Sequence, residues 1–168
     1  IVGMDFNVND MAACIFVNRN GIYHCVEEIT KGRDTDYMGQ ILKDRYLSKG
    51  HKVTVYPDAS GGNTSSKGAD KSDLDILKSY GLYVHARKSN PRVRERVNCV
   101  NKAFQDSKVL INSMRCPETA KCIEQQPYDK NGEPCKKSGL DHQCDAFGYP
   151  ITELFPIHKP VAAPRMRR

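Results

Sequence analysis

The chain has 168 residues, close to the usual size of one domain and long enough to bury a core without a disulfide or metal staple. A hydrophobic content of 39% and a charged content of 27% are ordinary for a globular protein and exclude a disordered or collagen-like chain. The longest apolar run, residues 11–17, is far too short to span a membrane, so we expect no membrane partner. We expect one domain over residues 1–155 and a basic, flexible tail over residues 156–168.

The net charge of +6 is concentrated in one part of the chain. Residues 85–115 carry +6, whereas residues 1–84 carry -1 and residues 116–168 carry +1. Such clustering indicates an anionic partner, although a solvated helix face would look the same.

The seven cysteines include no C-x-x-C pair, which favours reduced thiols. A zinc site built from Cys116, Cys122, Cys135, His142 and Cys144 is a weaker alternative, because their spacings match no common zinc motif.

Alternating apolar residues over 2–8 predict a first strand, with Asp5 on the face opposite the apolar set. Apolar runs at 11–17 and 22–29 flank Asn20 and Gly21, the strongest short signal for a hairpin. We therefore expect three strands in antiparallel order. Asp34 then starts a helix that Gly50 ends, and residues 51–56 form another strand.

A helix that links two strands of one sheet makes those strands parallel. Asp58 then falls at the carboxyl end of the strand beside the one that carries Asp5. Residues 59–70 read as a Gly- and Ser-rich loop. We expect helices at 73–80, 92–104, 117–126 and 140–149, the last ending before Pro150, and short strands at 82–86 and 109–111. The fold class is α/β, with a mixed sheet flanked by helices.

Two carboxylates at one sheet edge repel each other unless a cation lies between them, and carboxylates suit Mg²⁺ or Mn²⁺. The last helix carries Asp141 and Asp145 on one face. Asp145 is the stronger candidate for a further ligand, because its neighbours are apolar and a carboxylate there needs a partner. Asp141 could instead be the helix N-cap.

Several motifs carry a resemblance: Gly3-Met4-Asp5-Phe6-Asn7, Tyr56-Pro57-Asp58-Ala59-Ser60-Gly61, Ser89-Asn90-Pro91, Arg94-Glu95-Arg96-Val97-Asn98 with Val100-Asn101, and Asp141-His142 with Asp145-Ala146 and Tyr149. Over residues 1–149 their order and spacing resemble the nuclease domain of the large terminase subunit of tailed bacteriophages. The resemblance implies an RNase H-like fold and an endonuclease that cuts concatemeric double-stranded viral DNA during genome packaging, in the host cell cytoplasm. Phe147-Gly148 departs from the family, which more often has Leu-Arg there.

The resemblance implies metal ligands at Asp5, Asp58 and Asp145, with Asp141 a weaker candidate. Two Mg²⁺ or Mn²⁺ ions would activate water and stabilise the leaving oxygen, with Asp5 bridging both. His142 could move a proton near the leaving group, or could simply pack the helix. Glu27 and Glu28 rank low as ligands, since an exposed strand end explains them equally well.

The basic segment is expected to bind phosphates in a salt-dependent, sequence-independent way through Arg87, Lys88, Arg92, Arg94, Arg96 and Lys102. Lys67 and Lys71, in or beside the loop, are weaker candidates. The chain contains no Walker motif. Together with the start at Ile1, this predicts a carboxyl-terminal piece of a longer protein. By resemblance, its partners are an upstream ATPase domain, the portal protein and the small terminase subunit.

Two alternatives remain. Another RNase H-like nuclease, such as a resolvase or transposase, would share the acidic residues but choose different DNA. A non-catalytic module that binds DNA or the portal would carry the same acids for structural reasons.

Overall fold

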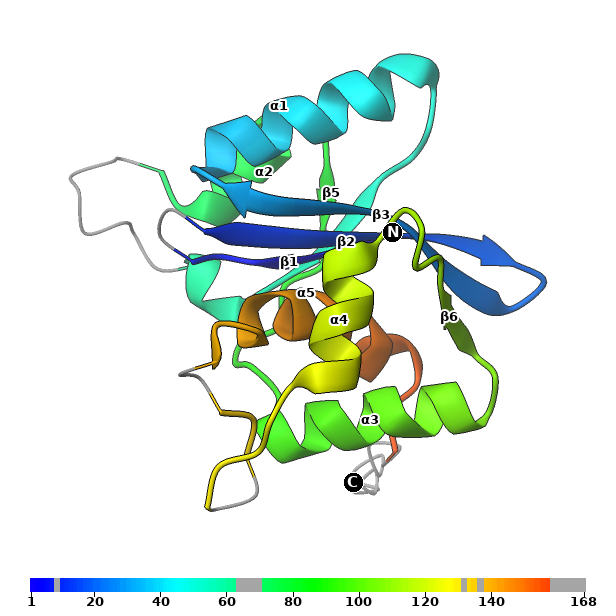
Figure 1. Cartoon of the computed structure of the whole chain (residues 1–168). Helices are drawn as coiled ribbons and strands as arrows, with labels where there is room; N and C mark the ends of the chain where they lie inside the picture. Colours follow the sequence, from blue (N-terminus) through cyan, green and yellow to red (C-terminus); the bar gives the residue numbers. More distant parts are fainter. Residues whose placement is uncertain (8–9, 63–70, 131–132, 136–137, 158–168) are drawn as a thin grey trace, which may run out of the picture.

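The computed structural model describes residues 1–7, 10–62, 71–130, 133–135 and 138–157. Six strands form one mixed sheet: β1 (Val2–Asp5), β2 (Met11–Arg19), β3 (Ile22–Gly32), β4 (Thr54–Pro57), β5 (Tyr83–Val84) and β6 (Val109–Ile111). Their order is β5-β4-β1-β2-β3-β6, with β1, β2 and β3 antiparallel and the outer strands parallel to their neighbours (Figure 1). The predicted fold class is confirmed.

The hairpin between β2 and β3 turns at the predicted residues. Asn20 and Gly21 both have positive φ, 54° and 84°, as a two-residue type I′ turn requires. The Gly21 amide also donates to the Asn18 side chain at 2.9 Å. The turn fixes the register of the two longest strands.

The crossover from β3 to β4 places β4 next to β1. Helix α1 (Thr35–Arg45) begins where the Asp34 side chain accepts a hydrogen bond from the Tyr37 amide at 2.7 Å. A short 3₁₀ turn (Leu47–Lys49) follows and ends at Gly50, whose φ is 81°. Strand β4 then runs parallel to β1, and the Asp58 amide donates to the Met4 carbonyl at 2.9 Å. Asp5 and Asp58 therefore end neighbouring strands, as predicted.

Helices cover both faces of the sheet (Figure 1). Helices α1 and α2 (Asp73–Ser79) lie on one face, over a core that includes Met4, Met38 and Leu77. Helices α3 (Val93–Gln105), α4 (Pro117–Gln125) and α5 (Asp141–Leu154) lie on the other, over a core that includes Phe16 and Phe147. Within the described ranges, no helix has the length and apolar character needed to cross a membrane.

Helix α5 does not end before Pro150, so that prediction was wrong. Proline has no N–H to donate to the carbonyl of Ala146, one turn earlier. That carbonyl instead lies against Gly3 of β1: a Cβ on Gly3 would fall 2.6 Å from Pro150 Cδ and closer still to the Ala146 oxygen. Close packing of α5 on β1 thus keeps the chain helical past Pro150 and brings the acidic face of α5 beside Asp5.

Candidate metal centre

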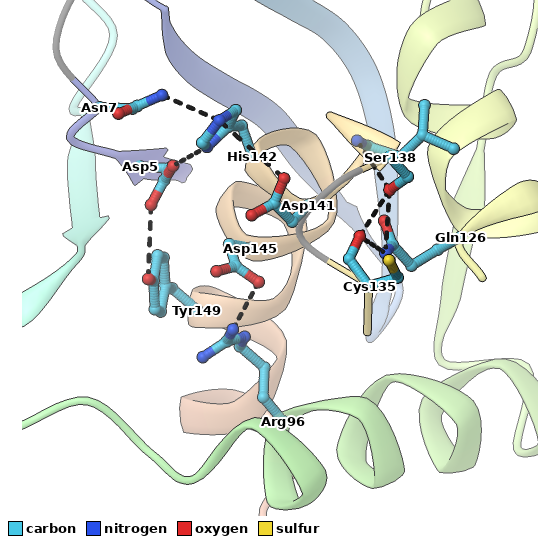
Figure 2. A network of polar contacts seen from close by, with 11 residues as sticks. Asp5, Asn7, Arg96, Gln126, Cys135, Ser138, Asp141, His142, Asp145 and Tyr149 are labelled. Carbon is cyan, nitrogen blue, oxygen red and sulfur yellow. Dashed lines mark hydrogen bonds and ion pairs between the residues drawn. The ribbon is translucent and has the colours of Figure 1, made fainter. Parts of the chain in front are cut away.

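Asp5 lies at the end of β1 and points toward α5 (Figure 2). Only 7% of the residue is exposed. Its Oδ2 lies 3.0 Å from Nδ1 of His142, and its Oδ1 accepts a longer hydrogen bond of 3.5 Å from the Tyr149 hydroxyl. Both partners come from α5, so the packing of α5 on β1 positions this carboxylate.

The surroundings of Asp5 disfavour its charged form. The pKa of Asp5 is raised from 3.8 to about 6, chiefly by burial and then by the negative charge of Asp145, against the lowering effect of the His142 hydrogen bond. The charge of Asp58 adds a smaller rise. Three carboxylates therefore act on one another at this edge of the sheet, and a cation would relieve their repulsion.

This pKa predicts how the stability of the metal-free protein depends on pH. Folded Asp5 holds its proton up to about pH 6, whereas unfolded Asp5 releases it near pH 4, so the contribution is favourable at low pH and is lost as the pH rises through 6. In EDTA, the wild-type protein should therefore lose about 3 kcal/mol relative to Asp5→Asn between pH 3 and pH 7. Urea unfolding of both proteins at several pH values measures this difference. A constant difference would contradict the prediction.

Asp58 is fixed by the segment that follows β5. Its Oδ1 accepts hydrogen bonds from the Ser60 amide at 2.7 Å and from the Asn90 side chain at 2.6 Å. The oxygen of the same Asn90 amide accepts from the Ala59 backbone at 2.8 Å. Asn90 thus ties the basic segment to the strand end that carries Asp58. Sequence reasoning gave Asn90 no role, although the residue lies within a quoted motif.

Asp145 faces the basic helix α3. Its Oδ1 is hydrogen-bonded to the guanidinium of Arg96, which is 5% exposed (Figure 2). The Arg96 guanidinium also lies over the Tyr149 ring, 5.0 Å from its centroid. Burial, followed by the charges of Asp145 and Asp58, raises the pKa of the Tyr149 hydroxyl, which keeps it a neutral donor. Arg96, which is expected from the sequence to bind DNA, instead pairs with Asp145 inside the candidate site.

His142 is held on both sides of its ring. Asn7 places its amide nitrogen 2.8 Å from Nε2, so a neutral ring accepts there and donates from Nδ1 to Asp5. Asp141 lies 3.9 Å from the same Nε2, and its buried Oδ1 accepts no hydrogen bond from the residues that the structure describes. A buried carboxylate oxygen in this setting suits a cation or an incoming water better than a structural cap.

The donor set fits Mg²⁺ or Mn²⁺ in chemistry, since it consists of hard carboxylate oxygens gathered at one sheet edge. In the part of the chain that the structure describes, however, no three His, Cys, Asp or Glu side chains stand close enough to hold an ion. Asp145 is engaged by Arg96, and Asp5 by His142. The same finding gives no support to the zinc alternative, and all seven cysteines are free thiols.

The remaining candidates have varied surroundings. Arg87 donates to Glu153 at 2.6 Å, and Lys102 donates to Asp106 at 2.6 Å. Lys71, Lys88, Arg92 and Arg94 are exposed, whereas Lys67 lies outside the described residues. Glu27 and Glu28 both have structural partners: Glu27 pairs with Arg45, and Glu28 accepts from the amides of Glu118 and Thr119 at the start of α4.

Comparison with known proteins identifies relatives of this fold. Residues 2–154 match the family model described as the terminase RNaseH-like domain. None of the curated proteins compared with the chain matches it in sequence.

Solved structures of phage terminases match the chain. The large terminase of a thermophilic bacteriophage is 22% identical, with a TM-score of 0.69 over 90% of this chain and 38% of that one. The P22 large terminase nuclease domain is 16% identical, with a TM-score of 0.67 over 92% and 81%. The nuclease domain of the large terminase from bacteriophage SPP1, solved with bound Mn, is 17% identical, with a TM-score of 0.59 over 90% and 84%. The chain thus spans little more than a third of the thermophilic phage protein, but most of the isolated nuclease domains.

Proposed function

Because the chain belongs to the terminase RNase H-like domain family, we propose that it is a metal-dependent endonuclease that cuts concatemeric double-stranded DNA during viral genome packaging. The observation that carries the proposal is that Asp5 and Asp58 end neighbouring strands on the side covered by α5, so that the charges of Asp58 and of Asp145 on α5 both raise the pKa of Asp5. The nuclease domain of the SPP1 large terminase, with its bound Mn, supports the choice of metal.

In this proposal, Asp5, Asp58 and Asp145 would hold two Mg²⁺ or Mn²⁺ ions, and Asp141, whose Oδ1 lies 3.9 Å from Nε2 of His142, would be a weaker further ligand. The ions would supply two effects when bound: a lower pKa for the attacking water and neutralisation of charge on the scissile phosphate. The water oxygen forms a bond to phosphorus as one P–O ester bond breaks, and the leaving oxygen takes a proton. Once Nε2 of His142 leaves Asn7, it is free to take up the proton that the attacking water loses and to pass it to the leaving oxygen.

The basic segment would lay DNA across this site. Lys88 and Arg92 are exposed and lie two residues to either side of Asn90, which is hydrogen-bonded to Asp58. Phosphates bound by these two side chains would pass next to the carboxylates. Arg94, also exposed, continues the same basic surface at the start of α3. An upstream ATPase domain, the portal protein and the small subunit would be further partners.

Arg92→Ala should weaken DNA binding uniformly across sequences, because a phosphate contact carries no base information. The slope of log K against log salt should fall in magnitude by about 0.9, since the variant neutralises one phosphate fewer. Fluorescence anisotropy with a labelled duplex at several salt concentrations measures both changes. Lys43→Ala, an equal charge change on the opposite face of the sheet, is the control and should leave the slope unchanged. Equal slopes for Arg92→Ala and wild type would remove Arg92 from the DNA path.

A plasmid assay tests the proposed activity. Supercoiled DNA is incubated with the chain in Mg²⁺, Mn²⁺ or EDTA, beside the variant Asp58→Ala. We expect nicked and linear products with metal, none in EDTA, and none from the variant. Absence of metal-dependent cutting at any protein concentration would leave a non-catalytic DNA- or portal-binding module. A preference for branched DNA would instead favour a resolvase-like nuclease.

A further inference from the structure

Within the described residues, Arg96 is the arginine of α3 that lies in the candidate site, whereas Arg94 is exposed. Its side chain is 6% exposed, and its guanidinium donates to Asp145 and lies over the Tyr149 ring. An arginine keeps its proton in proteins, so this charge is permanent.

Gly148 makes room for this arrangement. A Cβ on Gly148 would lie 2.6 Å from Arg96 Cγ and 2.7 Å from Cδ. The stem of Arg96 therefore fills the space that a side chain at position 148 would need. The packing of α3 against α5 is built around the arginine, which holds its head at Asp145.

Resting on the metal centre of the proposed function, we propose that Arg96 is a positioning residue that competes with the divalent cation for Asp145. In the metal-free protein the guanidinium neutralises the carboxylate and relieves its repulsion with Asp5 and Asp58. A cation that takes Oδ1 of Asp145 must displace this guanidinium, since two positive groups cannot share that oxygen without repulsion. Arg96 thereby lowers the affinity of the site for metal, and metal binding requires the Arg96 side chain to move away from Asp145.

The opposite role is equally concrete. A side chain that orients a ligand supports metal binding, and its removal usually costs 10–100-fold in affinity. Competition predicts the reverse sign. The sign of the change in Kd therefore separates the two roles, and a purely structural role would leave Kd unchanged.

The test is calorimetric titration of Mn²⁺ into the wild-type chain and Arg96→Met, whose unbranched side chain keeps much of the stem packing over Gly148. We expect the variant to bind Mn²⁺ about tenfold more tightly, since a hydrogen bond to a charged group no longer has to be broken. Arg96→Lys, which keeps the charge, should stay near the wild-type Kd. Lys43→Met removes the same charge from an exposed position of α1, on the opposite face of the sheet, and serves as the control. A weaker or unchanged Kd in Arg96→Met would overturn the inference.

A second measurement needs no variant, in case Arg96→Met does not fold. The guanidinium ¹⁵N–¹H resonances of Arg96 are followed in the wild-type chain during addition of Mg²⁺. Competition predicts that they shift and lose protection from exchange as the metal saturates. Resonances that keep their position at saturating Mg²⁺ would overturn the inference while leaving the metal centre intact. If the wild-type chain and every variant bind neither ion, the proposed function itself fails, and the inference with it.

Discussion

Asp5→Asn is expected to lower metal-dependent cleavage by about three orders of magnitude, because a metal centre supplies several kcal/mol of transition-state stabilisation and each 1.36 kcal/mol is tenfold in rate. An amide keeps the shape of the side chain and a hydrogen-bonding partner for His142, but removes the charge that would hold cations. The loss should persist at saturating Mn²⁺. Single-turnover cleavage of a labelled duplex measures it.

The expected stability change makes Asp5→Asn distinctive. The Asp5→Asn protein should be more stable than wild type in EDTA at pH 7, because burial and the charge of Asp145 penalise ionised Asp5 in the folded wild-type protein. Asp44→Asn, at an exposed position of α1, is the matched control and should change neither property. Cleavage by Asp5→Asn within tenfold of wild type would remove Asp5 from the metal centre.

Gly3→Ala is expected to destabilise the fold by about 3 kcal/mol, the upper part of the usual range for overpacking. A methyl group at this position collides with the Ala146 carbonyl and with the Pro150 ring, neither of which can rotate away. Helix α5 must then move off β1 and carry Asp145, His142 and Tyr149 with it. Thermal unfolding should show a fall in Tm of about 10 °C, with loss of cleavage.

Gly62→Ala is the control for Gly3→Ala. Among the residues that the structure describes, its Cβ would meet only Leu74 Cδ1 at 3.6 Å, an ordinary contact. The variant should therefore keep the wild-type Tm to within a degree or two. If Gly3→Ala were as stable as Gly62→Ala, the close approach of α5 to β1 would not be what positions the acidic residues.

The placement of Asp5 and Asp58 could be predicted from sequence, because it depends on local signals. Period-two apolar residues mark β1, Asn20 and Gly21 mark the hairpin, and a helix between strands makes β4 parallel to β1. Each signal spans a few residues. Together they place the two aspartates on adjacent strand ends, without knowledge of any contact distant in sequence.

The placement of Arg96 could not be predicted in the same way. The sequence of α3 indicates a basic helix whose arginines face solvent. Nothing within the helix indicates that Arg96 is buried, because its partner Asp145 lies 49 residues later in the sequence. The available signal was Gly148: a small residue on a packed helix face leaves space for a long side chain from elsewhere. Similarly, the rule that a proline ends a helix considers only neighbouring residues, and it wrongly predicted that α5 ends before Pro150. Helix α5 continues because Gly3 of β1 leaves room for the Ala146 carbonyl and the Pro150 ring.

The most direct test of the metal centre is a crystal structure of the chain soaked with Mn²⁺, with anomalous scattering recorded near the manganese edge. We predict anomalous peaks held by Asp5, Asp58 and Asp145, with the Arg96 guanidinium moved away from Asp145. No manganese at these three carboxylates under saturating Mn²⁺, with Arg96 still on Asp145, would contradict both the proposed nuclease centre and the role assigned to Arg96.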